Sequence, residues 1–205
     1  MSKVAIVGDP SGTGTFTISA PNGNTDRTLV LPDEAGTVLT SAGVPASAMP
    51  AGSVLQVVST TKTDAYSFLG TDFADVPGLS VSITPISSAS KILIISSVSG
   101  QGGVSASFLA TRLVRNSTEI AVGDAHTSGA ARATSSSGYT QDGGGLLHLS
   151  MVHLDSPSTT SATTYKVQAS SLHSGAAAYI NRSQQDNSYT RARTTSSITV
   201  MEIAG

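Results

Sequence analysis

Apolar and polar residues alternate with period two along much of this 205-residue chain, and Val, Ile, Thr and Tyr are frequent in the alternating segments. This pattern is typical of β-strands, whose successive side chains point to opposite faces of a sheet. Segments with helical spacing are nearly absent, so we expect an all-β protein. Ten strands are predicted after residue 52, at residues 53–60, 65–69, 79–84, 91–98, 106–115, 118–122, 146–154, 164–172, 177–181 and 196–203.

Short strands at regular spacing with turn residues between them predict a β-sandwich or a β-barrel. One tight connection can be located from the sequence. The four residues Arg115, Asn116, Ser117 and Thr118 have the composition of a hairpin turn between two of the strands.

The first 43 residues hold four short strand candidates, at 3–7, 15–19, 27–31 and 36–40. So few strands cannot close a core, because isolated hairpins are marginally stable in water. We therefore expect this segment to become ordered by association with other chains. Pro45 and Pro50 then mark a stiff connector. The predicted organisation is an N-terminal segment (1–45), a linker (46–52) and a C-terminal domain (53–205).

Several predicted strands are apolar on both faces, although a strand of an antiparallel sandwich usually has one face in water. We interpret one face as core and the other as a contact with a neighbouring copy of the chain, and therefore expect an obligate oligomer. The candidate core or contact residues are Ile92, Leu93, Ile94, Ile95, Leu147, Leu149, Met151, Ile198, Val200 and Met201.

The composition narrows the function classes. Charged residues make up only 12% of the chain, the formal net charge is −2, and cysteine is absent. The missing cysteines exclude disulfides and thiol chemistry, and the near-neutral charge argues against a general nucleic-acid binder. No stretch reaches the roughly 20 apolar residues of a membrane span. The apolar run at the N-terminus ends at Gly8 and is too short for a signal peptide.

Part of the N-terminal segment resembles a motif of bacteriophage tail-fibre and tail-spike proteins: a Thr-rich strand at residues 15–21, the sequence Asn-Thr-Asp-Arg-Thr-Leu-Val-Leu-Pro-Asp at 24–33, and Gly-Thr-Val-Leu-Thr at 36–40. The C-terminal part resembles the trimeric TNF/C1q-like jelly-roll heads that end many such fibres. The matching segments are residues 50–56, 88–94, 112–116, 163–168 and 197–203.

This resemblance implies a short trimeric β stalk followed by an antiparallel jelly-roll β-sandwich head. It also implies attachment to a tail, baseplate or capsid protein of the virion through residues 1–45, and contact of the head with a glycan or protein on the host surface. Typical fibres are much longer and carry many stalk repeats, whereas this chain has about one. Two alternatives therefore stay open: a purely structural capsid- or baseplate-decorating appendage, and a cellular C1q-like lectin, which the stalk motif disfavours.

We predict no enzymatic activity, no cofactor and no metal. The Gly-rich residues 8–14 lack the Lys and the following helix of a phosphate-binding loop. His148 and His153 lie five apart on one predicted strand, so they face opposite sides and cannot chelate one ion. One alternative stays open, a carboxylate pair for glycoside hydrolysis drawn from Asp124, Asp142, Asp155 and Asp186.

Two long loops are the candidate receptor contacts, since loops of this length in compact domains are usually functional or disordered. Amides, Tyr and Arg suit sugar hydroxyls and acidic glycans. The opposing interpretation is a solvated loop or a polar contact between subunits. The candidates in residues 123–145 are His126, Arg132, Tyr139, Gln141 and Asp142, and those in residues 181–195 are Asn181, Arg182, Gln184, Gln185, Asp186, Asn187, Tyr189 and Arg191.

Overall fold

The computed structural model describes residues 10–15, 17, 22–26, 28, 44–103, 107–125, 127–129, 131–137, 144–187 and 189–205. The chain divides into two compact units, Met1–Val38 and Leu39–Gly205. The strands of the described residues all lie in the second unit. The stalk strands predicted at 3–7, 15–19, 27–31 and 36–40 lie outside the described residues apart from Thr15, Thr17 and Thr28.

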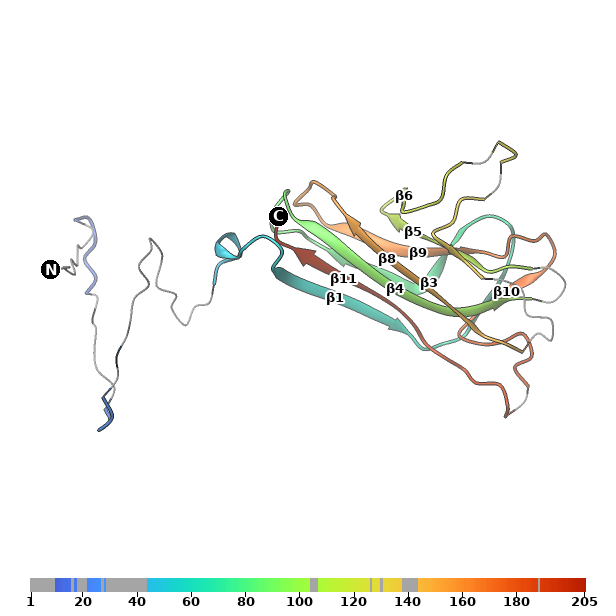
Figure 1. Ribbon diagram of the computed structural model, residues 1–205, viewed down its shortest axis with the longest axis horizontal. Coiled ribbons are helices and arrows are strands. Elements are labelled where there is room, and N and C mark those ends of the chain that lie inside the picture. Colours follow the sequence, from blue (N-terminus) through green and yellow to red (C-terminus); the bar gives the residue numbers. More distant parts are fainter. Residues whose placement is uncertain are drawn as a thin grey trace. The chain divides into compact units, whose positions relative to one another are not determined.

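The second unit is a β-sandwich of two antiparallel sheets (Figure 1). Its strands are β1 (Val54–Lys62), β2 (Tyr66–Leu69), β3 (Ala74–Ile83), β4 (Lys91–Gly102), β5 (Ala110–Arg115), β6 (Thr118–Ile120), β7 (Ser135–Ser136), β8 (Leu147–Asp155), β9 (Thr163–Ser170), β10 (Ala177–Ile180) and β11 (Ser196–Ile203). A single 3₁₀ turn, Ala46–Ala48, precedes β1.

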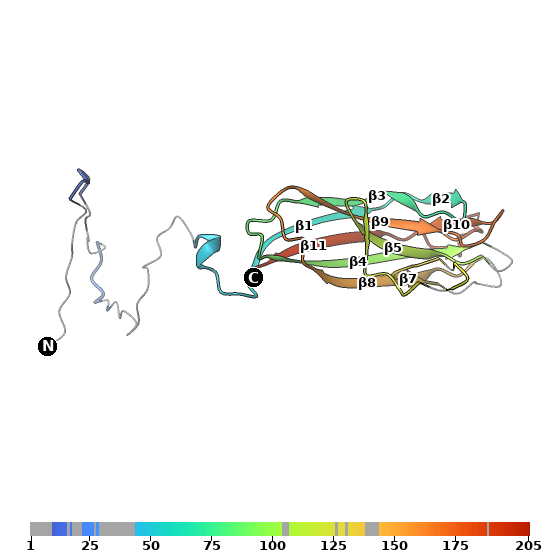
Figure 2. The same ribbon diagram turned by 90° about the horizontal axis from the view of Figure 1, so that it is seen from above.

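The first sheet has the order β1-β11-β4-β10-β2, with β8 paired to the other side of β4, and we call it sheet A. The second has the order β3-β9-β5-β6, with the short β7 on β5, and we call it sheet B. The chain passes back and forth between the sheets, from β3 to β4, from β4 to β5, and from β8 to β9. This order is that of a jelly roll, and Figure 2 shows the strands of both sheets running along the length of the sandwich.

The core lies between the two sheets, where every second residue of the strands β4, β9 and β11 is buried. In β4 the inward positions are Ile92, Ile94, Ser96 and Val98, and in β11 they include Ile198 and Val200. Sheet B contributes Leu79, Leu113, Tyr165 and Val167 among others. The alternation that predicted the strands therefore also identifies their inward faces.

The all-β prediction is confirmed, and each of the ten predicted strands after residue 52 has a counterpart. The hairpin turn is also present, with Asn116 in the left-handed region at φ 54°, a conformation that Asn tolerates. Two differences stand out. Strand β3 begins five residues earlier than predicted, because Pro77 and Gly78 fall in an irregular stretch between the paired residues Asp75 and Ser80. The two-residue β7 was missed, because so short a strand has no pattern to detect.

Candidate functional site

The two ends of the sandwich differ in what they present. At one end the residues preceding β1 meet the end of the chain, with Gly52 N–H donating to the Ala204 carbonyl (2.8 Å) and Ala204 N–H donating to the Ser53 carbonyl (2.8 Å). We call this the linker end. The connections after β1, β2, β4, β9 and β10 lie at the opposite end, which we call the loop end (Figure 1). The predicted loop 181–195 is therefore at the loop end.

Asn181 holds the base of this loop and does not face solvent. It is fully buried in the left-handed conformation, at φ 62°. Its Nδ2 donates to the carbonyls of Lys62 (2.9 Å) and Asp64 (3.0 Å), and its Oδ1 accepts from Ser196 Oγ (2.6 Å). The prediction that Asn181 contacts a receptor is therefore wrong, because every polar atom of its side chain is used inside the domain.

Asp186 organises the loop through two arginines. Arg193 donates from Nε (3.2 Å) and Nη2 (2.6 Å), and Arg182 Nη1 lies 3.5 Å from the same carboxylate. The hydrogen bonds from Arg193, more than the contact with Arg182, hold the pKa of Asp186 below its ordinary value. The guanidinium of Arg182 also lies over the ring of Tyr179, 4.7 Å from its centroid. We infer that Asp186 and Arg182 shape the loop as well as lining its surface.

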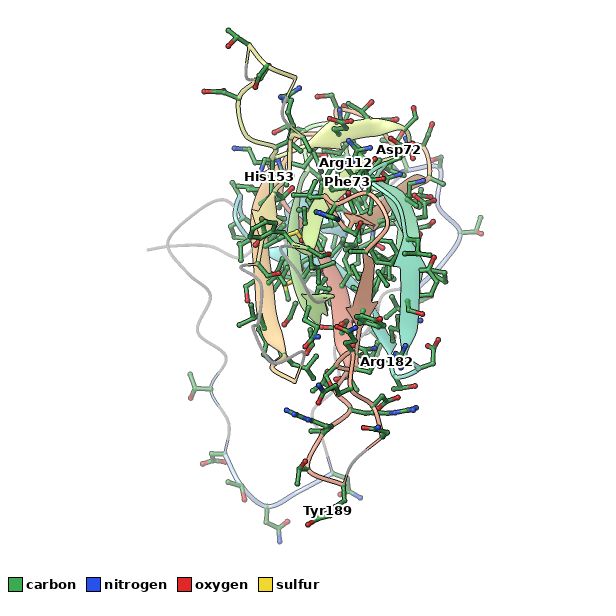
Figure 3. All side chains as sticks on the ribbon, turned by 90° about the vertical axis from the view of Figure 1, so that its right-hand side faces the viewer. Asp72, Phe73, Arg112, His153, Arg182 and Tyr189 are labelled. Carbon is green, nitrogen blue, oxygen red and sulfur yellow. The ribbon has the colours of Figure 1, made fainter. Side chains whose placement is uncertain are left out.

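The remaining candidates of this loop are available at its surface. Tyr189 is fully exposed and points away from the sandwich (Figure 3). Gln185 and Asn187 are exposed, and Gln185 accepts a hydrogen bond from Arg191 Nη2 (3.2 Å). Gln184 lines a cavity of about 430 Å³ together with Tyr179, His173 and Leu69. We call this cavity the tip pocket.

The second predicted loop is described only in part. His126, Tyr139, Gln141 and Asp142 lie outside the described residues. At its C-terminal end the loop meets the first one, since a side chain at Gly144 would overlap the guanidinium of Arg191. Arg132 lies elsewhere, on the flank formed by sheet B, and its Nε donates to the Gly123 carbonyl (2.8 Å).

A second cavity, of about 450 Å³, lies beside Arg132. We call it the flank pocket. Its charged lining residues are Asp72, Arg112, Glu119 and Arg132, and Phe73 supplies an aromatic wall. Figure 3 shows Asp72, Phe73 and Arg112 gathered on one side of the sandwich, away from Arg182 and Tyr189. Of this set the sequence indicated Arg132 alone, because the others come from three separate segments and match no motif.

The outward face of sheet A is apolar in the half nearest the linker end, whereas toward the loop end it carries a row of hydroxyl side chains, Thr61–Ser197–Ser97–Ser150. Paired residues form a row across four strands, Val57–Met201–Leu93–Leu154, and the next row is Ser59–Thr199–Ile95–Val152. Val152 is 68% exposed, Val57 53%, Leu154 48% and Ile95 40%. Lys91, at the start of β4, is the single Lys, Arg, Asp or Glu among the outward positions of β1, β11, β4 and β8.

The candidate core and contact residues divide between the two faces of sheet A. Those on the buried face are Ile92, Ile94, Leu149, Met151, Ile198 and Val200. Leu93, Ile95 and Met201 point outward, and Leu147 is half-buried at the start of β8.

Signs of metal or catalytic chemistry are sparse in the described part of the chain. There is no group of three or more His, Cys, Asp or Glu side chains placed to hold a metal ion in it. Of the acids considered for glycoside hydrolysis, Asp155 is buried and bonded to Arg115 and Tyr165, and Asp186 is bonded to two arginines. Within the same residues, no helix is long and apolar enough to cross a membrane.

Comparison with known proteins assigns the chain to no family. No protein-family model matches the chain, and no curated protein matches it in sequence. A solved structure of infectious bursal disease virus, Gt strain, aligns with a TM-score of 0.40 and 13% identity over 76% of this chain and 39% of the viral chain. The Gx strain structure gives 0.38 and 15%, over 74% and 43%. The chain thus spans about two fifths of the length of these viral chains. Similarity at this level does not bear on function.

Proposed function

We propose that the protein is a non-enzymatic, homotrimeric fibre protein of a bacteriophage. Its N-terminal region attaches to the virion, and its jelly-roll head contacts the host cell surface, with surface polysaccharide as the expected ligand. The observation that carries the proposal is the outward face of sheet A, where the apolar side chains of Val57, Ile95, Val152 and Leu154 are exposed on strands of one sheet.

Three copies arranged around an axis would bury this face. Monomeric proteins rarely leave a large contiguous apolar surface in water, and such a surface usually marks an interaction site. At the outward positions of β1, β4, β8 and β11 there is one lysine and no acidic side chain. Packing these faces against one another would therefore bury few charges. The chain also has no cysteines to form disulfides, so association between copies supplies stability to a protein that works outside cells.

The arrangement of the ends supports a role in attachment. Residues 44–53 enter at the linker end, while the loop 181–195 and the tip pocket lie at the loop end. A head joined to the virion through its linker end therefore presents Tyr189, Gln185 and Gln184 at the far end. In a trimer the loop would occur three times, and weak individual contacts would gain avidity on a repetitive surface.

Adsorption of the purified, fluorescently labelled protein to a panel of bacterial strains tests this proposal. We expect binding to one or a few strains, and we expect Arg182→Ala, Gln184→Ala and Tyr189→Ala combined to abolish it without changing the oligomer. The matched control is Ser88→Ala, Ser156→Ala and Thr160→Ala, which removes exposed polar groups at the linker end.

Two outcomes count against the host-contact role. One is a wild-type protein that adsorbs to no strain that the source virus infects, which would favour a purely structural appendage. The other is a loop variant that adsorbs as well as wild type. Release of soluble sugar from the bound surface would contradict the non-enzymatic assignment.

A further inference from the structure

We propose that the flank pocket binds one uncharged sugar residue of a glycan. This inference rests on the proposed function, since it names the ligand class and adds a binding site on the side of the head. It follows from the chemistry of the lining, from the hydrogen bonds that fix Arg112 and Glu119, and from the face of the sandwich on which the pocket opens.

The formal charges of the lining cancel. Asp72 and Glu119 contribute two carboxylates, and Arg112 and Arg132 contribute two guanidinium groups. An anionic ligand such as a phosphate or an acidic sugar would meet two carboxylates, and a cationic ligand would meet two arginines. A neutral polyol satisfies both kinds of group, because each hydroxyl can donate to a carboxylate and accept from a guanidinium.

Several polar atoms of the lining are open to a ligand. Within the described residues Asp72 has no hydrogen-bond partner, and both Nη atoms of Arg132 and Nη2 of Arg112 have none. Ala131 and the part of the Phe73 ring that Arg112 does not cover give the C–H groups of a sugar ring an apolar surface. Polar and charged side chains make up most of the lining, and the volume of the pocket lies within the range of about 300 to 1,000 Å³ found for small-ligand sites.

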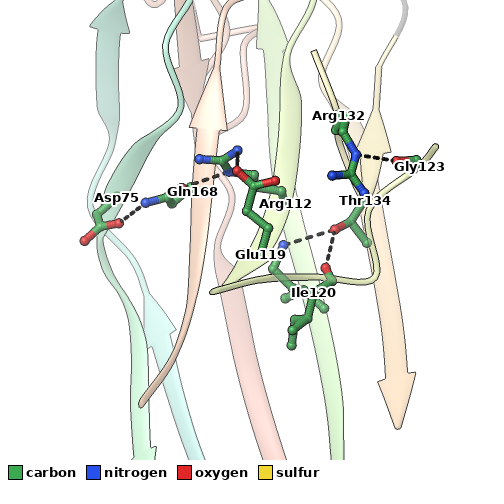
Figure 4. A network of polar contacts seen from close by, with 9 residues as sticks. Asp75, Arg112, Glu119, Ile120, Gly123, Arg132, Thr134 and Gln168 are labelled. Atoms are coloured by element: carbon green, nitrogen blue, oxygen red, sulfur yellow. Dashed lines mark hydrogen bonds and ion pairs between the residues drawn. The ribbon is translucent and has the colours of Figure 1, made fainter. Parts of the chain in front are cut away.

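Two of the charged side chains of the pocket, Arg112 and Glu119, are held in place before any ligand arrives (Figure 4). Arg112 donates from Nε to Gln168 Oε1 (2.9 Å) and from Nη1 to Glu119, and its guanidinium lies 4.3 Å from the centroid of the Phe73 ring. Gln168 in turn donates to Asp75 Oδ1 (2.7 Å). Fixed side chains lose little conformational entropy on binding, which favours affinity.

The loop that carries Arg132 is also fixed to sheet B. Thr134 N–H donates to the Thr111 carbonyl (2.9 Å), its Oγ1 accepts from Leu113 N–H (3.0 Å), and Gly123 N–H donates to the Ala133 carbonyl (3.1 Å). These bonds bring the loop alongside β5 and β6. Arg132 therefore forms a defined wall of the pocket.

The pocket stays accessible in the proposed trimer. Arg112, on β5, and Glu119, on β6, belong to sheet B, and their outward face is opposite the apolar face of sheet A that would be buried. Each copy would carry one pocket on the outside of the head, so three sites would act together on one polysaccharide.

Binding of the intact protein to an array of neutral and acidic glycans, followed by titration of neutral hits in solution, tests the inference. We expect neutral glycans to bind, and Asp72→Asn to weaken the titrated affinity at least tenfold, with Glu119→Gln and Phe73→Ala acting in the same direction. Asp124→Asn is the matched control, because Asp124 is an exposed acid next to the same loop and outside the pocket; we expect it to stay within twofold of wild type. Asp72 is exposed, so its substitution should leave folding intact.

Three results overturn the inference: no neutral glycan binds, acidic glycans bind in preference, or neutral glycans bind equally well to wild type and Asp72→Asn. The two proposals fail in distinguishable ways. If cell adsorption depends on Tyr189 but not on Asp72, the result supports the fibre function and contradicts glycan binding by the flank pocket. If the protein adsorbs to no cell but binds glycans in a way that depends on Asp72, the result contradicts the fibre function and supports glycan binding by the flank pocket.

Discussion

At the scale of single residues, the interior of the head contains charged groups whose hydrogen-bonding atoms are occupied. Glu202 is fully buried and accepts hydrogen bonds from Gln56 Nε2 (2.5 Å) and Ile86 N–H (2.8 Å). Asp155 accepts from Tyr165 Oη (2.7 Å) and from Arg115 Nη1 (2.8 Å to Oδ1). Buried charges need such partners, because desolvation is costly. Each carboxylate therefore fixes a neighbouring segment.

Glu202 makes the stability of the head depend on pH. Burial by itself raises the pKa of Glu202, but the hydrogen bonds from Gln56 and Ile86 favour the charged form, and the pKa lies below its ordinary value of 4.5. A lowered folded-state pKa adds stability that is complete above pH 4.5 and is lost as the pH falls through the folded-state value. We expect denaturant midpoints to fall on acidification below pH 4.5.

The variant Glu202→Gln should show a smaller fall over the same pH range, because its side chain does not titrate. At pH 7 it should be less stable by about 1–3 kcal/mol, since an amide N–H₂ then replaces one carboxylate oxygen and faces one of the two donors. Chemical denaturation at fixed protein concentration measures both effects. An unchanged pH dependence in the variant would assign the acid sensitivity to other groups.

Asp155 should matter more than Tyr165. Asp155→Ala leaves Arg115 and the Tyr165 hydroxyl without their partner, and we expect a loss of about 3 kcal/mol. Tyr165→Phe removes one hydrogen bond and keeps the ion pair, and we expect a loss of about 1 kcal/mol. Chemical denaturation measures the free energy of unfolding of the two variants and of the control Ser156→Ala, which changes an exposed neighbouring residue. Equal losses in both variants would show that the ion pair adds nothing.

At the scale of elements, the period-two pattern located the strands because each one has a side chain in the core at every second position. The same pattern exposed the two-sided apolar character of β4, β8 and β11. It could not predict which strands pair, since register depends on contacts between distant residues. The flank pocket was hidden for that reason: Asp72, Arg112, Glu119 and Arg132 become neighbours only after β3, β9, β5 and β6 have assembled.

Strand β4 depends on a close approach that only glycine permits. A Cβ at Gly100 would overlap the carbonyl oxygen of Tyr179 and lie 2.7 Å from Leu109 Cδ2, and backbone atoms cannot move aside. We expect Gly100→Ala to destabilise the head by about 1–3 kcal/mol and to disturb β10 and the loop that follows it. Gly123→Ala is the control, because the nearest atom there is 3.9 Å away. Thermal unfolding compares them, and equal midpoints would contradict the close packing of β4 on β10.

At the scale of the whole molecule, the outward face of sheet A links the fold to the proposed function. A charge placed there should block assembly without harming the monomer. Val152 is 68% exposed in a single chain, so Val152→Asp should fold normally and yet prevent trimer formation. The control is Ser82→Asp, which puts the same charge on the exposed surface of sheet B. Circular dichroism checks the fold of both variants, and a Val152→Asp protein that still assembles would place the contact elsewhere.

The central claim is that copies of the chain bury the outward face of sheet A. Its most direct test is the mass of the wild-type protein in dilute solution. We expect sedimentation equilibrium to give three times the chain mass of 20.6 kDa, which is about 62 kDa. A well-folded protein that sediments at 20.6 kDa would contradict it, because the exposed apolar side chains of sheet A would then be stable in water.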